Sequence, residues 1–156
     1  MFDAIKTLEK LRKFCAYQDR CKADARKKLS DLGIAEKYHS GIIKKLQDEG
    51  FIDEQRFAAI FARGKFNGRK WGKIKIKMAL KQKEIHEDTI KNALNEIDKE
   101  AYTTTLKNLA EEKWQKLQKE KNLFTKKGKV AQFLIQKGFE GDLVWDVLRE
   151  LEKMEK

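Results

Sequence analysis

Proline is absent from this sequence of 156 residues, and cysteine and histidine each occur only twice. At an average usage of about 5%, a chain of this length would hold roughly eight prolines. Because proline breaks the interior of a helix, its absence permits a chain that is helical almost throughout. An all-α fold is therefore open to this sequence, although the absence alone does not require one.

The few cysteines and histidines leave little room for metal or thiol chemistry. Cys15 and Cys21 have no metal-ligand spacing, and His39 and His86 are isolated from them and from each other. A zinc site needs four Cys or His ligands in paired short spacings. We interpret both cysteines as reduced, part-buried helix residues. No Ser-His-Asp or Cys-His set is present either, so we expect no enzyme, no cofactor and no metal.

Long hydrophobic runs are missing as well. No apolar run approaches the roughly 18 residues that a membrane span needs, and the start MFDAIKTLEK lacks a signal pattern. We therefore expect a soluble, cytoplasmic protein without a membrane partner. Charged residues make up 39% of the chain and hydrophobic residues 40%, which is little apolar material for one thick core. Several thin helical units in a monomer suit this composition better.

Three segments of similar pattern recur along the chain. They are LSDLGI (29–34), LKQKEI (80–85) and LIQKGF (134–139), which lie 51 and then 54 residues apart. The alternative is a chance similarity of short helical patterns, but the shared breaker positions favour a true repeat. A fixed period near 50 residues indicates an array of helical modules, each burying a small core. We predict an all-α fold, an elongated array of three tandem three-helix repeats over residues 1–50, 51–98 and 99–156.

Capping residues predict where several helices begin and end. Asp19, Asp53 and Asp142 can each cap the helix that follows them, because a short acidic side chain accepts from the free amides of a first turn. Gly33 stands where a left-handed residue closes a helix. In the helix after Asp53, the predicted inward-facing stripe consists of Phe57, Ile60, Phe61 and Gly64.

The positive charge is concentrated between Arg63 and Lys83, in RGKFNGRKWGKIKIKMALKQK. This stretch holds nine Lys or Arg and no Asp or Glu, and so supplies +9 of the formal net charge of +11. With aromatic residues interleaved, such a concentration is typical of a surface that faces nucleic acid. The alternative is a solvated lysine-rich helix.

Helical spacing arranges these cations on one stripe. Lys70, Lys73, Lys77 and Lys81 recur at intervals of three, four and four, with Ile76 and Leu80 on one side and Ile74, Met78 and Trp71 on the other. Apolar residues on both flanks predict a helix wedged between neighbours, with its lysines outward. Such lysines can meet successive phosphates without reading sequence. The predicted basic surface comprises Arg63, Lys65, Arg69, Lys70, Lys73, Lys77 and Lys81.

Two aromatic residues of this stretch admit two interpretations. Phe66 and Trp71 could serve as platforms on which bases of a single strand stack. Alternatively, Phe66 closes one helix and Trp71 packs at the start of the next, and we favour packing for both. Gly68 and Gly72 bracket Trp71 and allow a tight entry to its helix.

Three segments resemble the RecX family of bacterial regulatory proteins. They are LQDEGFIDEQRFAAIFARGKF (46–66), RKWGKIKIKMALKQKEI (69–85) and FLIQKGFEGDLVWDVL (133–148). These are similar to the family's Gly-Phe-Ile-Asp and Arg-Phe-Ala segment, its basic helix and its C-terminal repeat, and the resemblance covers nearly the whole chain. The family usually has Lys-Gly-Ile where this chain has Lys83, Glu84 and Ile85. A residue other than glycine disfavours a left-handed cap, which leaves the form of this turn open.

The resemblance implies a function as well as a fold. It implies a non-enzymatic regulator that binds the RecA recombinase filament on single-stranded DNA. Such a regulator limits filament extension, ATP hydrolysis and strand exchange in recombination and DNA repair. The alternative is a stand-alone helical regulator acting on duplex DNA. Against it, lysines dominate where base readers would need Arg, Asn or Gln at the helix start.

Overall fold

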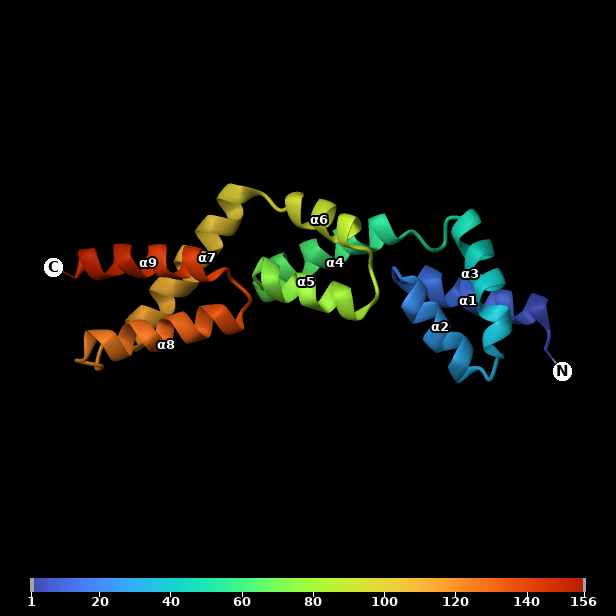
Figure 1. Cartoon of the computed structure of the whole chain (residues 1–156), viewed down its shortest axis with the longest axis horizontal. Helices are drawn as coiled ribbons and strands as arrows, with labels where there is room; N and C mark the ends of the chain where they lie inside the picture. Colours follow the sequence, from blue (N-terminus) through green and yellow to red (C-terminus); the bar gives the residue numbers. More distant parts are fainter. Residues whose placement is uncertain (1, 156) are drawn as a thin grey trace. The chain divides into compact units, whose positions relative to one another are not determined.

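The computed structural model describes residues 2–155, and the regular secondary structure within them is entirely helical (Figure 1). This confirms the predicted all-α class, while the elongated outline stays a prediction. The helices are α1 (Ala4–Tyr17), α2 (Lys22–Asp31), the short 3-10 helix η1 (Glu36–Tyr38), α3 (His39–Asp48), α4 (Glu54–Arg69), α5 (Lys73–Gln82), α6 (Glu87–Asn95), α7 (Lys99–Lys116), α8 (Leu123–Gln136) and α9 (Gly141–Met154).

The helices form two compact units that each combine two stretches of the chain. The first unit is Met1–Phe61 with Leu80–Ala93, and the second is Ala62–Ala79 with Leu94–Lys156. Helices α4, α5 and α6 each contribute residues to both units. The boundaries that the sequence repeat suggests, after residues 50 and 98, stay a prediction.

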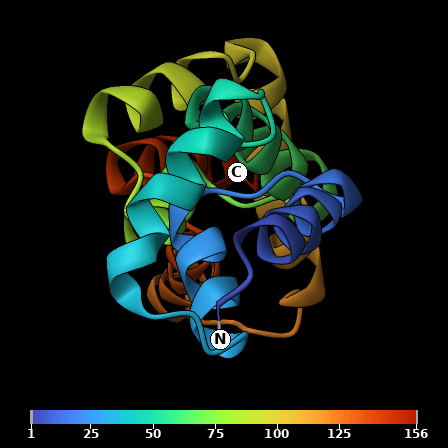
Figure 2. The ribbon, with the colours of Figure 1, turned by 90° about the vertical axis from the view of Figure 1, so that its right-hand side faces the viewer.

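The core of the first unit lies between α1, α2 and α3, which face the viewer in Figure 2. Leu11, Leu29 and Leu46, one from each helix, are fully buried there. Ile52 follows α3 and is buried in the same cluster. The apolar spacing of each helix thus produces one shared core, as amphipathic helices require.

Both cysteines are free, as the sequence suggested, but they are buried rather than part-buried, and Cys21 does not lie within a helix. Cys15 lies on α1, and Cys21 is the residue that precedes the first turn of α2. Burial raises the pKa of the Cys21 thiol to about 11. Because the thiolate is the reactive form, neither cysteine has the character of a nucleophile.

Polar contacts join α2 to the later segments of the first unit. The Lys83 ammonium lies 2.8 Å from the Asp24 carboxylate, and the Lys22 amide donates to Glu54 at 2.9 Å. Although burial acts to raise the pKa of Asp24, hydrogen bonds from Lys83 and from the Cys21 amide hold that pKa below its usual value. Lys83 therefore serves the fold, even though it belongs to the basic stretch.

One of the predicted caps is confirmed, and two are wrong. The Asp53 carboxylate accepts from the Arg56 amide at 3.0 Å, as a cap of α4 should. Asp19 instead binds the Arg56 side chain at 2.7 Å, while Cys21 and Asp24 close the start of α2. Asp142 lies inside the first turn of α9, which begins after Glu140.

The three repeated segments form the same turn at the ends of α2, α5 and α8. In each, the sixth amide donates to the first carbonyl: Ile34 to Leu29 at 3.0 Å, Ile85 to Leu80 at 3.2 Å and Phe139 to Leu134 at 3.2 Å. The fifth residue has a positive φ in all three, at Gly33, Glu84 and Gly138. This is the Schellman motif, in which a left-handed residue lets the chain satisfy the last carbonyls of a helix. The sequence repeat is therefore a structural repeat at these turns.

Glu84 keeps this turn without the glycine that favours it. Its φ is 62°, a conformation that strains a residue with a Cβ atom. The Glu84 carboxylate meets the Arg26 guanidinium of α2 at 2.6 Å. The turn at Glu84 thus has the same form as the turns at Gly33 and Gly138.

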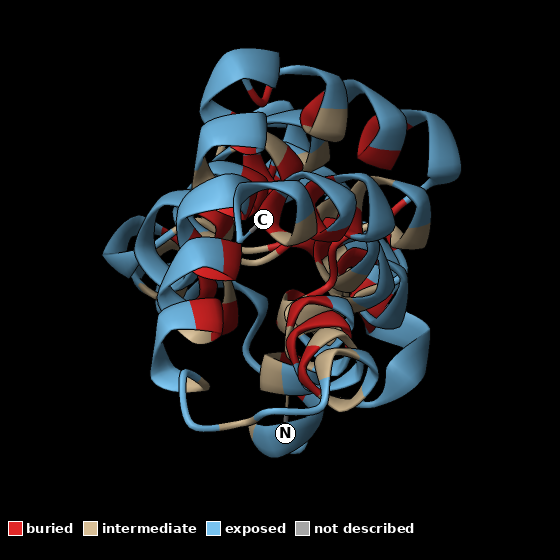
Figure 3. Ribbon diagram, turned by 90° about the vertical axis from the view of Figure 1, so that its left-hand side faces the viewer, coloured by how far each residue is buried: buried red, intermediate tan, exposed pale blue. Residues whose placement is uncertain are grey.

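The core of the second unit lies between α7, α8 and α9, whose facing sides carry the buried residues (Figure 3). Leu106, Leu134 and Leu148 are fully buried there. Near the far end of the bundle, Lys126 is buried against the Trp114 ring, with its ammonium 2.7 Å from Glu155. A buried lysine is stable only when it is paired in this way.

Candidate nucleic-acid interface

The predicted lysine stripe does not begin on a helix. Helix α4 ends at Arg69 and α5 begins at Lys73, so Lys70 lies in the turn between them. Its φ is 56°, which is left-handed. The prediction that Lys70 belongs to the stripe of the basic helix is therefore wrong. Of the four lysines assigned to that stripe, only Lys73, Lys77 and Lys81 lie on α5.

Helix α5 begins where it does because its first amides bond to the junction of α8 and α9. The Gly72 amide donates to the Lys137 carbonyl at 2.7 Å, and the Ile74 amide donates to the Gly138 carbonyl at 2.9 Å. A Cβ atom on Gly72 would lie 2.2 Å from the Gly138 carbonyl carbon, closer than atoms can approach. Gly72 is required for this close backbone approach, while Gly68 lies inside α4 with open space around it.

A buried tyrosine completes the start of α5. The Lys73 amide donates to the Tyr102 hydroxyl at 2.9 Å, and that hydroxyl donates to the Glu140 carboxylate. Burial, and then the hydrogen bond to Glu140, raise the pKa of Tyr102 well above its usual value. The phenol therefore stays protonated and acts as a fixed link between α5, α7 and the start of α9.

Only one flank of α5 is buried. Ile76 and Leu80 are fully buried, as predicted, but Ile74 is 45% exposed and Met78 is 59% exposed. The prediction of a helix wedged between neighbours on both sides is therefore wrong. Ile60 of α4 is likewise 40% exposed and Gly64 is exposed, so neither belongs to the inward stripe assigned to it.

The cations of the predicted basic surface occupy different environments. Arg63 and Lys77 are exposed and have no ion pair among the described residues. The Lys73 ammonium lies 5.0 Å from the centre of the Tyr102 ring, and its side chain is half-buried. Lys81 belongs to the first unit, where its ammonium lies 3.9 Å from Glu87.

Two lysines flank Trp71. The ammonium of Lys75 lies 4.6 Å from the centre of the indole ring, and that of Lys65 lies 5.0 Å from it. Trp71 is half-buried, and its ring attracts both ammonium groups by cation–π interaction. Phe66 is 6% exposed and contacts the Tyr102 ring, so its packing role is confirmed and it presents no face to a base.

The structure adds two lysines that the sequence-based surface omitted, Lys75 and Lys137. The Lys137 ammonium donates to the Arg69 carbonyl at 2.8 Å, close to the turn that carries Lys70. Partial burial, and then the charges of Lys75 and Lys70, lower the pKa of Lys137. We call Lys70, Lys75 and Lys137 the lysine cluster. Like charges held together in this way favour the binding of an anion.

Only one of these two lysines could have been assigned to the basic surface from the sequence. Lys75 lies inside the basic stretch and could have been included on charge alone. Lys137 lies more than sixty positions after Lys70, and nothing in the spacing connects the two. The connection comes from the backbone contact between Gly72 and Gly138, which only the folded chain reveals.

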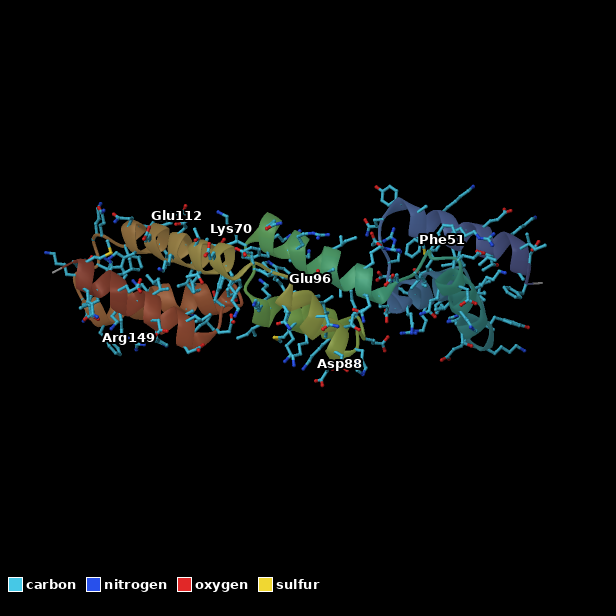
Figure 4. The ribbon with its side chains drawn as sticks, turned by 90° about the horizontal axis from the view of Figure 1, so that it is seen from above. Phe51, Lys70, Asp88, Glu96, Glu112 and Arg149 are labelled. Carbon is cyan, nitrogen blue, oxygen red and sulfur yellow. The ribbon has the colours of Figure 1, made fainter. Side chains whose placement is uncertain are left out.

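Acidic residues bound the lysine cluster on the side of α7. Lys70 lines a hollow together with Glu111 and Glu112, and Figure 4 marks Lys70 and Glu112. A polyanion would be repelled there, so the surface available to phosphates ends at Lys70. The arrangement offers cation contacts, and no group of three metal-ligating side chains occurs within residues 2–155. Over the same range, every helix is too short or too polar to span a bilayer.

Comparisons with known proteins match most of this chain. The family profile described as "RecX, second three-helix domain" matches residues 53–94, and the one described as "RecX, third three-helix domain" matches residues 100–148. The crystal structure of RecX from Lactobacillus salivarius is similar with a TM-score of 0.85 and 28% identity, covering 96% of each chain.

Curated relatives give the same family. The "Regulatory protein RecX" of Clostridium botulinum (strain Eklund 17B / Type B) is 31% identical over 94% of this chain and 66% of its own length. That of Limosilactobacillus reuteri (strain DSM 20016) is 29% identical over 93% of this chain. The chain spans only 54% of the Limosilactobacillus protein, which is about half of its length.

Proposed function

The chain belongs to the RecX family, and from that premise we propose that it is a non-enzymatic regulator of the RecA recombinase filament on single-stranded DNA. Its mechanism is steric and electrostatic. The chain docks along the filament, contacts recombinase protomers and DNA together, and lowers ATP hydrolysis, filament extension and strand exchange.

The observation that carries this proposal is the lysine cluster with its exposed neighbours. The Lys137 ammonium is held at the Arg69 carbonyl, where partial burial and then the charges of Lys75 and Lys70 lower its pKa, and Lys77 has no ion pair among the described residues. Cations held in this way bind phosphates well, since the anion removes their mutual repulsion. We propose that the DNA-facing set consists of the predicted basic surface together with Lys75 and Lys137.

The affinity of this interface depends on salt. If about four to six phosphates of the single strand are neutralised, log K falls with log salt concentration at a slope of roughly −3 to −4. Fluorescence anisotropy of the labelled chain, titrated with RecA assembled on oligo-dT, measures this slope. An affinity that is independent of salt would count against phosphate contacts.

Three further titrations separate the partner from the DNA. RecA alone, oligo-dT alone and the assembled filament are each titrated against the wild type and the Lys75→Ala/Lys77→Ala variant. We expect the filament to bind the wild type most tightly and the variant to lose about tenfold. The matched control is Lys27→Ala/Lys44→Ala, because both of those lysines are exposed and paired with a carboxylate on their own helix.

The alternative, a regulator that inserts α5 into the major groove of a duplex, is disfavoured by the start of that helix. Recognition helices contact base edges through their N-terminal residues. In this chain the amides of Gly72 and Ile74, at the start of α5, bond to the carbonyls of Lys137 and Gly138, and Gly72 lies against the Gly138 backbone. Footprinting on random duplex sequence distinguishes the two, since a defined protected site would support the alternative.

A further inference from the structure

Helices α1 and α2 of the first unit border a hollow that lies outside the predicted basic surface. Its volume is about 520 Å³, and its wall includes four cations, Lys10, Lys13, Arg20 and Lys28, and two aromatic residues, Phe14 and Tyr17. No carboxylate lines it. The volume falls within the roughly 300–1,000 Å³ of sites that hold small molecules.

Tyr17 is an exposed part of this wall. It is the last residue of α1, its side chain is 83% exposed, and it has no hydrogen bond or ring contact among the described residues. A tyrosine that neither packs nor bonds contributes nothing to the core. It does present a flat aromatic face to solvent, which is the shape that a nucleic-acid base stacks upon.

Arg20 is fixed beside the hollow rather than free in solvent. Its guanidinium carbon lies 3.8 Å from the centre of the Phe14 ring, and its Nε donates to the Phe14 carbonyl at 3.0 Å. The Lys28 ammonium lies 5.5 Å from the centre of the same ring. Phe14 therefore holds two cations in place, so that their ordering precedes ligand binding.

The remaining lysines of the hollow carry uncompensated charge. Lys10 and Lys13 have no ion pair among the described residues. Elsewhere in this unit, exposed lysines do find carboxylates, as Lys27 does with Asp31 and Lys44 with Asp48. The hollow thus combines unpaired cations with an unused aromatic ring.

We propose that this hollow is a binding site for single-stranded nucleic acid. Lys10, Lys13 and Lys28 contact backbone phosphates, and the Tyr17 ring stacks on one base. A duplex would not offer a free base face, and an acidic peptide would use the cations without needing the ring. The site is built by α1, α2 and the residues that directly follow each helix, and it requires no recombinase.

A photochemical cross-link tests where the base lies. The full chain is irradiated with a dT oligomer that carries one 5-iodouracil, in the absence of recombinase, and the adduct is located by mass spectrometry. We expect an adduct on Tyr17 that unlabelled oligo-dT removes by competition. Adducts confined to other residues would overturn the proposal.

Affinities of variants test the chemistry of the site. We expect Tyr17→Ala to weaken binding of fluorescein-labelled oligo-dT by about fivefold or more, and Tyr17→Phe to retain the wild-type affinity. Lys10→Ala/Lys13→Ala should reduce the magnitude of the salt slope by roughly 1.4, the value for two phosphates on a single strand. The control Lys27→Ala/Lys44→Ala removes the same charge from paired positions and should leave the slope near that of the wild type.

Two other results would overturn the proposal. One is an unchanged affinity of Tyr17→Ala for oligo-dT. The other is equal competition by a poly-glutamate peptide, which would assign the hollow to acidic peptides. Since no recombinase is present, a chain that failed to regulate RecA could still bind oligo-dT at this hollow. A chain that regulated RecA could likewise fail to bind oligo-dT there.

Discussion

Glu84 holds a left-handed conformation that glycine adopts with less strain. Replacing it with glycine relieves strain of about 1 kcal/mol and removes the ion pair with Arg26. That pair is exposed and contributes about 0–1 kcal/mol. We therefore expect Glu84→Gly to be about as stable as the wild type or slightly more so, in urea unfolding followed by circular dichroism.

Glu84→Ala is the control for this comparison, because it removes the ion pair and keeps the strain. We expect the glycine variant to exceed the alanine variant in free energy of unfolding by about 1 kcal/mol. An alanine variant as stable as the glycine variant would show that the turn at Glu84 is not strained.

Gly72 and Gly68 make a second pair of contrasting positions. We expect Gly72→Ala to lower the free energy of unfolding by about 1–3 kcal/mol or more, because the added Cβ meets the Gly138 backbone. Gly68→Ala lies on α4 with open space around it and should stabilise the helix by up to about 1 kcal/mol. Urea unfolding measures both, and equal effects would contradict the close approach at Gly72.

Single residues were predictable from the sequence where their partners are close along the chain. Gly33 and Asp53 act within a few residues of their position, so turn and capping chemistry identified them correctly. Asp19 was assigned wrongly because Arg56, 37 positions later, binds its carboxylate. Glu140, not Asp142, precedes α9, and its carboxylate binds Tyr102. Both wrong cap predictions, at Asp19 and Asp142, thus result from contacts with side chains that are distant in the sequence.

At the scale of elements, helical periodicity predicted the buried face of α5 correctly but not the residue at which the helix begins. Ile76 and Leu80 were assigned correctly because the helical period alone places them on one face. Lys70 was assigned to the helix because its spacing of three from Lys73 continues the helical period, although Gly72 directly precedes Lys73. The boundary before Lys73 comes from Tyr102 and the turn at Gly138, which bond the first amides of α5.

Tyr102 is the element-scale link whose loss should be measurable. Tyr102→Phe leaves the Lys73 amide and the Glu140 carboxylate without their shared partner. We expect a loss of about 1–3 kcal/mol in the free energy of unfolding at neutral pH. The isosteric ring retains the contacts with Phe66 and Phe139, so the loss reports the hydroxyl.

The pH dependence of the free energy of unfolding is the control for the Tyr102→Phe comparison. Burial and the bond to Glu140 raise the pKa of the folded tyrosine, so its contribution is complete below the unfolded value of about 10. Above that pH the unfolded chain releases the proton and the folded chain does not, and the free energy of unfolding falls. The difference between wild type and Tyr102→Phe should therefore shrink as pH rises above about 10. A constant difference would contradict the raised pKa.

At the scale of the whole molecule, the concentration of positive charge indicated a nucleic-acid surface but could not identify the residues that form it. Lys83 is paired with Asp24, Lys81 lies near Glu87, and Lys137 joins Lys70 and Lys75 from a distant turn. Net charge along a sequence does not record which cations the fold neutralises. The residues that stay available to an anion are known only after the chain has folded.

The central claim is that this chain regulates a recombinase filament through its lysine cluster and the neighbouring exposed lysine Lys77. Its most direct test is the rate of RecA-dependent, single-strand-stimulated ATP hydrolysis, titrated with substoichiometric amounts of the chain. The wild type is compared with Lys70→Ala/Lys75→Ala/Lys77→Ala and with the control Lys27→Ala/Lys44→Ala/Lys129→Ala, which removes equal charge from surface ion pairs.

We expect the wild type and the control to inhibit hydrolysis at similar concentrations, and the Lys70→Ala/Lys75→Ala/Lys77→Ala variant to need about tenfold more. Equal inhibition by all three proteins would show that RecA is the partner but that the replaced lysines do not form the interface. No inhibition by the wild type at any ratio to RecA would contradict the proposed function.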